Sequence, residues 1–264
     1  AYLRQKDVDL LLITTANKQA ARVYEGLKLR KPPVKHCDKA YFWITHPKGF
    51  AQSVLITKSI PFNAVLKYPL GTAIFLVNLF KQQPLIEKHK RTEHTIIEYA
   101  EFSEEFDVFW KNNPARSNEF MAQRDKDSMM WHFSHSFKEE KVWVMGIKEN
   151  GFLRSYAVFF RYDNEKYLLK RVRLIDFQTL KGGNDDLLIL LNYALRKATK
   201  TNVHMVEVFG FKESIQQIVK SRAPFERKLP SWLFFYKALN KDLEKRLDNE
   251  AVWNPTSFDG DGSL

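Results

Sequence analysis

The chain has 264 residues, of which 44% are apolar and 14% aromatic, enough to fill the core of one large or two small domains. Its mean hydropathy of −0.40 and mixed composition exclude a fibrous or largely disordered protein. Lysine and arginine exceed aspartate and glutamate by 42 − 31 = +11. Such a surface attracts nucleic acid, acidic lipid or a phosphorylated ligand, or is simply a solvated basic surface.

The sequence contains a single cysteine, Cys37, so no disulfide can form within the chain. One cysteine also gives no zinc-ligand spacing, and we expect no metal site. The first eight residues carry Arg4, Lys6 and Asp7, unlike a signal peptide, and the longest apolar stretch, 70–80, is shorter than a membrane-spanning helix. We therefore expect a cytoplasmic protein without a transmembrane segment.

The N-terminal part predicts a strand, a short helix and a second strand. The apolar run 8–15 is typical of a buried strand, Asn17 is a helix N-cap, and 40–45 is aromatic and β-like. Residues 53–60 fit either a strand or a helix. We expect an apolar helix over 72–81, followed by a polar linker over 84–93.

The rest of the chain predicts a meander of strands followed by a right-handed βαβ crossover. We expect a mostly antiparallel mixed sheet, flanked by helices, with parallel neighbours after its fourth strand. A charged helix and a flexible or contact-making tail should close the chain. The expected strands are 94–102, 141–148, 152–162, 167–177, 203–209 and 229–238, and the expected helices are 103–110, 118–133, 185–199 and 213–221.

The order of elements in 1–45 repeats that of 185–238: an apolar strand, a short amphipathic helix, a basic turn with proline, and an aromatic strand. Coincidence in so common an order is the alternative. If the repeat is genuine, 1–93 is the C-terminal half of a first unit plus a linker. Residues 94–240 are then a complete second unit, and 241–264 a C-terminal helix and tail. On this hypothesis the chain enters its first unit midway.

The motif Asn17-x-x-Ala20-x-x-x-Tyr24, together with this element order, resembles the GNAT superfamily of acyl-CoA N-acyltransferases. The resemblance implies that Asn17 and Ala20 approach the pantetheine arm of the cofactor and that Tyr24 acts as a general acid. Seven residues are two helical turns, so Asn17 and Tyr24 share one face. The family's following Gly-Phe pair is replaced by Lys28 and Leu29. The alternative is that Tyr24 only packs on the sheet and Asn17 only caps the helix.

The family's pyrophosphate loop follows the fourth strand and opens the next helix, where backbone amides hold phosphates. The matching segment here is 178–183, directly after Phe177. The resemblance implies cofactor contacts from Phe177, Gln178, Leu180, Lys181, Gly182 and Gly183. Lys181 stands where the family has a glycine, and an ordinary Gly-Gly turn is the alternative. The first unit therefore carries the motif with Asn17 and Tyr24, and the second unit carries the altered pyrophosphate loop.

A general base is also needed to deprotonate an amine acceptor. Members of the family use an acidic residue near the fourth strand, and Asp176 occupies that place, with Glu207 on the next strand. Either carboxylate could instead pair with Arg171 or Arg173.

These patterns predict an N-acyltransferase, most simply an acetyltransferase, that uses acetyl-CoA or another acyl-CoA as co-substrate. The acceptor is expected to be an amine on a small molecule or sugar. One alternative is a non-catalytic module of the same fold that binds a partner or nucleic acid, which the charge of +11 and the altered loop favour. Another is transfer from aminoacyl-tRNA by a related tandem fold.

Overall fold

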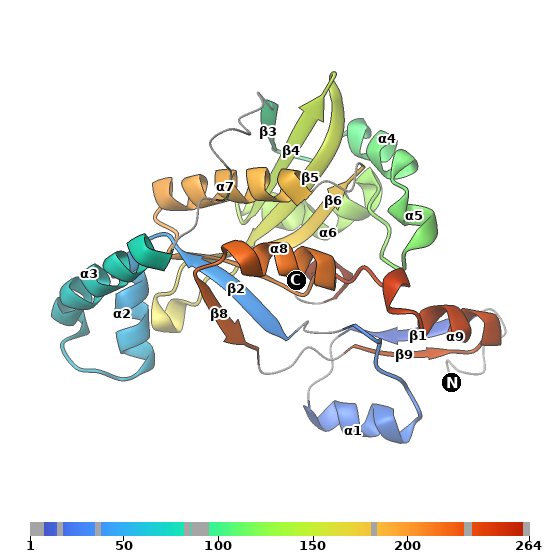
Figure 1. Cartoon of the computed structure of the whole chain (residues 1–264), viewed down its shortest axis with the longest axis horizontal. Helices are drawn as coiled ribbons and strands as arrows, with labels where there is room; N and C mark the ends of the chain where they lie inside the picture. Colours follow the sequence, from blue (N-terminus) through green and yellow to red (C-terminus); the bar gives the residue numbers. More distant parts are fainter. Residues whose placement is uncertain are drawn as a thin grey trace.

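The computed structural model describes residues 8–14, 18–34, 38–81, 85, 95–180, 184–229 and 234–260. Its helices are α1 (Lys18–Gly26), α2 (Pro47–Thr57), α3 (Asn63–Lys81), α4 (Glu104–Asn112), α5 (Ala115–Asn118), α6 (Lys126–Lys138), α7 (Asn184–Lys200), α8 (Glu213–Arg222) and α9 (Lys241–Leu247). Its strands are β1 (Leu10–Ile13), β2 (Lys39–Ile44), β3 (Thr95–Tyr99), β4 (Val142–Glu149), β5 (Phe152–Arg161), β6 (Arg171–Thr179), β7 (Met205–Phe209), β8 (Phe225–Lys228) and β9 (Phe235–Ala238) (Figure 1).

A seven-stranded sheet in the order β3-β4-β5-β6-β7-β2-β8 forms the centre of the protein. All its neighbours are antiparallel except β6 and β7, which are parallel and joined through α7. The turn between β4 and β5 has positive φ at both Asn150 and Gly151, as a tight hairpin requires. The predicted fold class, a mixed and mostly antiparallel sheet flanked by helices, is therefore confirmed.

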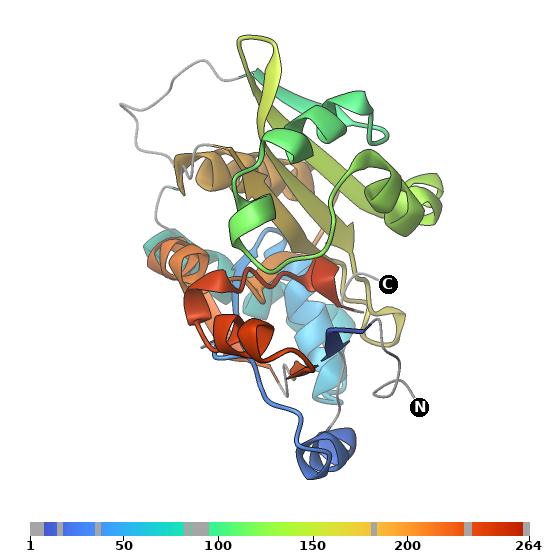
Figure 2. The same cartoon turned by 90° about the vertical axis from the view of Figure 1, so that its right-hand side faces the viewer.

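Helices cover both faces of this sheet, because its strands bury side chains on both sides. In β4, Val142 and Val144 pack with α4 and α6, whereas Trp143 and Met145 pack with α7. Figure 2 shows α4 and α6 on one side of the sheet and α7 on the other. Successive side chains along a strand point to opposite faces of the sheet, so neighbouring residues pack into two separate cores.

The last strands of the two predicted units are exchanged. β2, expected in the first unit, lies between β7 and β8 in the large sheet. β9, expected at the end of the second unit, instead pairs with β1 in a separate two-stranded sheet. An isolated bridge joins Arg30 to Tyr236 of β9. β9 therefore has a neighbour on each side, β1 and Arg30. In the same way, β2 has β7 on one side and β8 on the other.

Several predicted elements differ from the structure. The predicted helix 118–133 is helical only from Lys126 onward, because Phe120, two residues after α5, pairs with Trp253 of the C-terminal segment. Of the predicted strand 229–238 only β9 (Phe235–Ala238) forms, and an unpredicted strand, β8, precedes it in the other sheet. Residues 53–57 are helical, since His46 caps α2 by accepting a hydrogen bond from the Gly49 amide at 3.0 Å. The predicted linker 84–93 lies outside the described residues, apart from Leu85.

Of the two alternatives for the C-terminal tail, flexible or contact-making, the described part is the second, because it packs into the protein. Trp253, Thr256 and Phe258 are buried, and Phe258 joins the core beneath α6. Thr256 and Asp259 form a capping box around a 3₁₀ turn, Ser257–Asp259. The sequence alone left both alternatives open because the run of Asn, Pro, Ser, Asp and Gly is typical of loops.

Helix α3 is longer than the apolar stretch on which the expectation of no transmembrane segment is based. It is 19 residues long, and by length and composition alone it meets the minimum for crossing a membrane. The expectation counted only the uninterrupted run 70–80, whereas the helix continues through Lys67 and Pro69 from Asn63. It packs against α2 as an antiparallel hairpin, and Gly71 allows the close approach, because a Cβ there would lie 3.0 Å from Cα of Lys48.

The base of this hairpin contains a buried histidine, which gives a prediction on pH. The Nδ1 atom of His204 accepts a hydrogen bond from the Lys170 amide, and its ring stacks on His46. Burial, together with the charges of His46 and Lys170, lowers the pKa of His204 to about 4. The unfolded chain takes up a proton near pH 6.5, so the stability from the neutral ring is complete above pH 6.5 and is lost as the pH falls toward 4.

We expect the free energy of unfolding to fall by about 1–2 kcal/mol over this pH range. This is less than the full pKa shift corresponds to, because the ring of His204 still borders solvent. His204→Asn, whose amide oxygen can accept the same hydrogen bond, should show a flatter dependence of unfolding free energy on pH in urea titrations. Equal slopes for the two proteins between pH 4 and pH 6.5 would contradict the assignment.

Candidate functional site

The parallel strands β6 and β7 separate along their length. They pair from Arg171–Met205 to Leu174–Val208, and no pairing follows, although β6 continues to Thr179. A register shift against β5 falls at Ile175, directly where the separation begins. A bulge increases local twist, which turns the end of β6 away from β7. The main-chain groups of 175–179 that face β7 therefore have no strand partner on that side.

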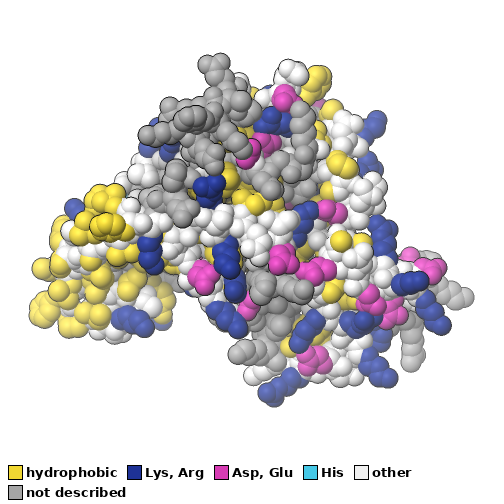
Figure 3. All heavy atoms as spheres, viewed as in Figure 1, with side chains coloured by type: hydrophobic (Ala, Val, Ile, Leu, Met, Phe, Trp, Pro, Cys, Tyr) yellow, Lys and Arg dark blue, Asp and Glu magenta, His cyan; other side chains and the backbone are white. Residues whose placement is uncertain are grey.

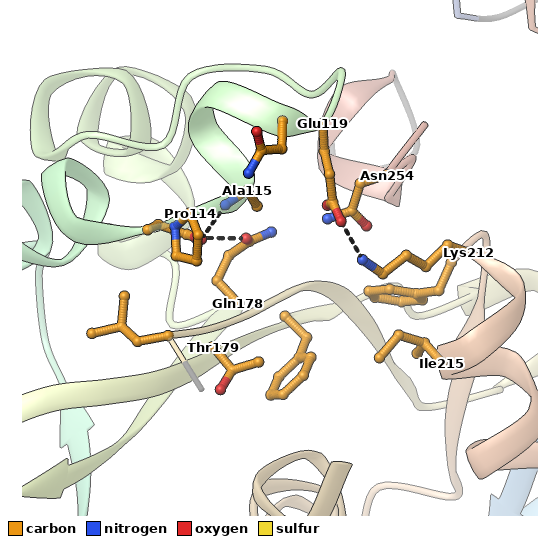
Figure 4. A pocket seen from close by; sticks show the side chains of 13 residues that line it. Pro114, Ala115, Glu119, Gln178, Thr179, Lys212, Ile215 and Asn254 are labelled. Carbon is orange, nitrogen blue, oxygen red and sulfur yellow. Dashed lines mark hydrogen bonds and ion pairs between the residues drawn. The ribbon is translucent and has the colours of Figure 1, made fainter. Parts of the chain in front are cut away.

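A cavity of about 230 Å³ occupies the opening between the two strands. The end of β6 forms one wall, through Phe177, Gln178 and Thr179, and the start of α8 with the preceding Phe211 forms another. The segment around α5 covers it from a third side (Figure 4). Pockets with apolar walls and a few convergent polar groups are the usual place for small ligands.

A chain of buried polar groups runs from this cavity into the core. Asn113 donates a hydrogen bond to Gln178 Oε1 at 3.2 Å, and Gln178 Nε2 donates to Asp176 at 3.2 Å. Asp176 pairs in turn with Arg124 at 2.9 Å, and both side chains are fully buried. Arg124 also binds Asp259 of the C-terminal segment at 3.0 Å. The network thus joins the cavity wall to both the segment before α6 and the end of the described chain.

The charges in this network compensate one another. Burial opposes the charge of the Arg124 guanidinium, but Asp176 and Asp259 outweigh it and raise its pKa above the ordinary value. Burial, reinforced by the negative charge of Asp176, raises the pKa of the Tyr156 phenol well above its usual range. Arg124 and Tyr156 both keep their protons at neutral pH, and Asp176 is the carboxylate that they contact.

An ion pair closes the outer side of the cavity. Lys212 Nζ at the start of α8 lies 2.8 Å from Glu119 Oε1 at the end of α5 (Figure 4). The second carboxylate oxygen, Oε2 of Glu119, is buried and has no hydrogen-bond partner. An unpaired buried carboxylate oxygen is costly, because it has lost its hydrogen bonds to water. Sequence analysis missed this pair, since 93 positions separate its members and neither belongs to a local motif.

The predicted site residues fall into two groups that lie apart. Phe177, Gln178 and Leu180 line the cavity. Tyr24 lies instead on α1, where it packs on Phe235 of β9 with ring centroids 5.6 Å apart. Ala20 is on the same helix. Both views place α1 at the end of the molecule away from the β6 opening (Figures 1 and 2).

Four of the predicted cofactor-binding residues, Asn17, Lys181, Gly182 and Gly183, lie outside the described residues. The prediction that Asp176 is a general base is untested. Its carboxylate lies next to the cavity but is held by Arg124 rather than by Arg171 or Arg173. Glu207 pairs with Arg173 at 3.0 Å and also with Arg227. For Glu207 the alternative to a general base, an ion pair with arginine, is therefore what the structure has.

Neither a family model nor a curated protein sequence matches the chain. Among solved structures, it is similar to a predicted acetyltransferase from Clostridium acetobutylicum solved with acetyl-CoA, at 12% identity and a TM-score of 0.41, covering 53% of this chain and 94% of that chain. A conserved protein of unknown function from Enterococcus faecalis matches at 10% identity and a TM-score of 0.49, covering 90% of this chain and 47% of that chain.

A tandem GNAT protein from the clavulanic acid biosynthesis pathway also matches, at 10% identity and a TM-score of 0.41, covering 88% of this chain and 64% of that chain. These likenesses concern the path of the backbone and carry no information on chemistry. The mixed and mostly antiparallel sheet flanked by helices is the fold class that the resemblance to the GNAT superfamily implies.

Proposed function

We propose that this protein is an N-acyltransferase that moves an acyl group, most simply acetyl, from acyl-CoA to an amine. The observation that carries the proposal is the parting of β6 from β7 after Leu174 and Val208 with a cavity in the opening. Unpaired strand edges offer main-chain donors and acceptors to an extended, amide-containing ligand such as a pantetheine arm.

The residues at the opening fit this co-substrate. The main chain of 175–179 would hold the arm, Phe177 would give it an apolar wall, and Gln178 is fixed in place by Asn113 and Asp176. Acyl-CoA supplies an activated thioester, whose acyl carbon accepts the amine while the thiolate leaves. Lys181, Gly182 and Gly183, which precede α7 in the sequence, stay predictions for the pyrophosphate.

Glu119 is the residue that we propose takes up the proton of the acceptor ammonium. Glu119 lines the cavity, and Lys212 holds one of its two carboxylate oxygens. This carboxylate can accept a proton without breaking a buried ion pair, whereas Asp176 would have to give up Arg124. We keep Asp176 as a second proposal for the same role.

Tyr24, Asn17 and Ala20 stay proposals for a separate site on α1, with Tyr24 as general acid. No tyrosine lines the cavity beside β6 among the residues described. The acceptor would be an amine on a small molecule or sugar. The non-catalytic alternative, binding of a partner or nucleic acid by the same fold, is tested by the experiment below.

We expect the wild-type protein to bind acetyl-CoA, measured by isothermal titration calorimetry. Thr179→Trp, which places a large ring in the opening, should weaken binding at least tenfold. The matched control is Thr179→Val, which keeps the volume and removes a hydroxyl that has no hydrogen-bond partner; it should bind like the wild type. Absence of binding by the wild-type protein would favour a non-catalytic module.

A further inference from the structure

Helix α3 is apolar on a side that the protein does not cover. The exposed apolar side chains of its hairpin with α2 are Ile60, Phe62, Val65, Leu66, Tyr68, Phe75, Leu76, Val77, Leu79 and Phe80. At 100° per residue those of α3 span more than half of the helix circumference. Figure 3 shows this lobe as the yellow region at the left of the molecule. We call these residues the hairpin patch.

Helices that are apolar over most of their surface are normally buried in a protein core or in lipid. Here only the narrow side that carries Gly71 and Asn78 is buried, and Asn78 fixes the helix to β2 by donating a hydrogen bond to the Ile44 carbonyl at 2.9 Å. Phe80 is 89% exposed and Phe62 is 80% exposed. So large a continuous apolar surface indicates a partner.

The charge around the hairpin patch indicates which partner. Residues 39–86 contain five lysines and no aspartate or glutamate. Lys48, Lys58, Lys67 and Lys81 lie on the hairpin, and none of them takes part in an ion pair among the described residues. Lys48 and Lys67 both lie over the ring of Tyr68 at 5.4 and 5.5 Å. An apolar hairpin that carries four lysines and no carboxylate of its own is complementary to an anionic lipid surface.

We propose that the α2–α3 hairpin docks the protein on the surface of a bilayer that contains anionic phospholipid. The hairpin patch enters the boundary between headgroups and acyl chains, and the lysines bind the headgroup phosphates.

The connectivity fits docking better than spanning. Helix α2 has 11 residues and is therefore about 16 Å long, roughly half of the ~30 Å hydrocarbon core. The strand before the hairpin, β2, and the strand after it, β3, belong to the same sheet, so both ends of the hairpin lie on the same side of the bilayer. A second copy of the chain is a poorer occupant, because two such patches would bring lysines together without any carboxylate between them.

Flotation of the full chain with vesicles tests the proposal. We expect binding to vesicles of equal parts phosphatidylcholine and phosphatidylglycerol, weaker binding to phosphatidylcholine alone, and a decline with added salt. The double variant Phe62→Asn with Phe80→Ser should lower affinity tenfold or more at unchanged net charge; asparagine is chosen because residue 62 has a φ of 57°. The matched control is Trp131→Ser with Phe152→Ser, two exposed apolar side chains on other elements, which should bind like the wild type.

A second pair of variants separates the hairpin lysines from the overall charge of +11. Lys58→Gln with Lys67→Gln should weaken binding about fivefold per lysine, whereas Lys111→Gln with Lys200→Gln changes the net charge equally and should have a smaller effect. No binding to anionic vesicles, or equal effects of the two lysine pairs, would overturn the proposal. A concentration-dependent dimer in sedimentation equilibrium that Phe62→Asn with Phe80→Ser abolishes, without vesicle binding, would assign the patch to a second copy.

Discussion

Arg124→Met should lower the free energy of unfolding by about 3–5 kcal/mol, the largest loss of stability that we expect from one substitution. The guanidinium is fully buried and neutralises Asp176, which is fully buried as well, and Asp259. Methionine fills a similar volume but leaves both carboxylates without a counter-charge, and an unpaired buried charge is what makes such a change severe. Guanidinium titration followed by circular dichroism measures the change.

The control for this prediction is Lys126→Met, which removes an ion pair with Glu104 at the protein surface. Its unfolding midpoint should stay close to that of the wild type, because solvent-exposed pairs contribute little. In the double variant Arg124→Met with Asp176→Asn, part of the lost stability should return, because the unpaired carboxylate of Asp176 is removed. Equal midpoints for Arg124→Met and the wild type would mean that the buried network does not stabilise the fold.

Glu119→Gln should lower the kcat of acyl transfer by about 10²–10⁴-fold if Glu119 takes up the acceptor proton. Glutamine keeps the shape of the side chain and an oxygen for Lys212, so the ion pair becomes a hydrogen bond and the cavity stays formed. Release of thiol from acetyl-CoA in the presence of a panel of amines measures the rate. The affinity for acetyl-CoA itself should change little.

The pH profile distinguishes proton transfer from a structural effect. If a carboxylate takes up the acceptor proton, the wild-type kcat/KM should have an acidic limb, and that limb should disappear in Glu119→Gln. Glu104→Gln, a substitution at an exposed carboxylate, should leave both rate and profile unchanged. An acidic limb that persists in Glu119→Gln and disappears in Asp176→Asn would transfer the role to Asp176, after allowance for the stability of that variant.

Local patterns in the sequence predict much of the fold. The turn Asn150-Gly151 and the acidic first turn after Ser103 give β4, β5 and α4 nearly at their observed bounds. Long-range pairing is what they do not contain. Nothing near residue 40 indicates that β2 pairs with β7, some 165 positions later, and nothing near Phe120 indicates Trp253 as its neighbour.

The candidate site shows the same limit. The segment Phe177–Leu180 was found because it follows a strand and resembles a known loop, and it does line the cavity. Glu119 and Lys212 each end or begin a helix without a motif, and only the tertiary fold brings them within 2.8 Å. Asp176 could be found as an acidic residue on the fourth strand, but its counter-ion Arg124 lies in the irregular segment between α5 and α6.

The exchange of β2 and β9 makes the two parts of the chain dependent on each other for folding. A fragment that starts at β3 would lack the strand between β7 and β8, and both would present open hydrogen-bonding edges, which favour aggregation. Because β2 must find partners across most of the chain, the large sheet closes only after long-range contacts form, and such topologies fold slowly. Dissection into separate halves would therefore yield unpaired strands rather than autonomous domains.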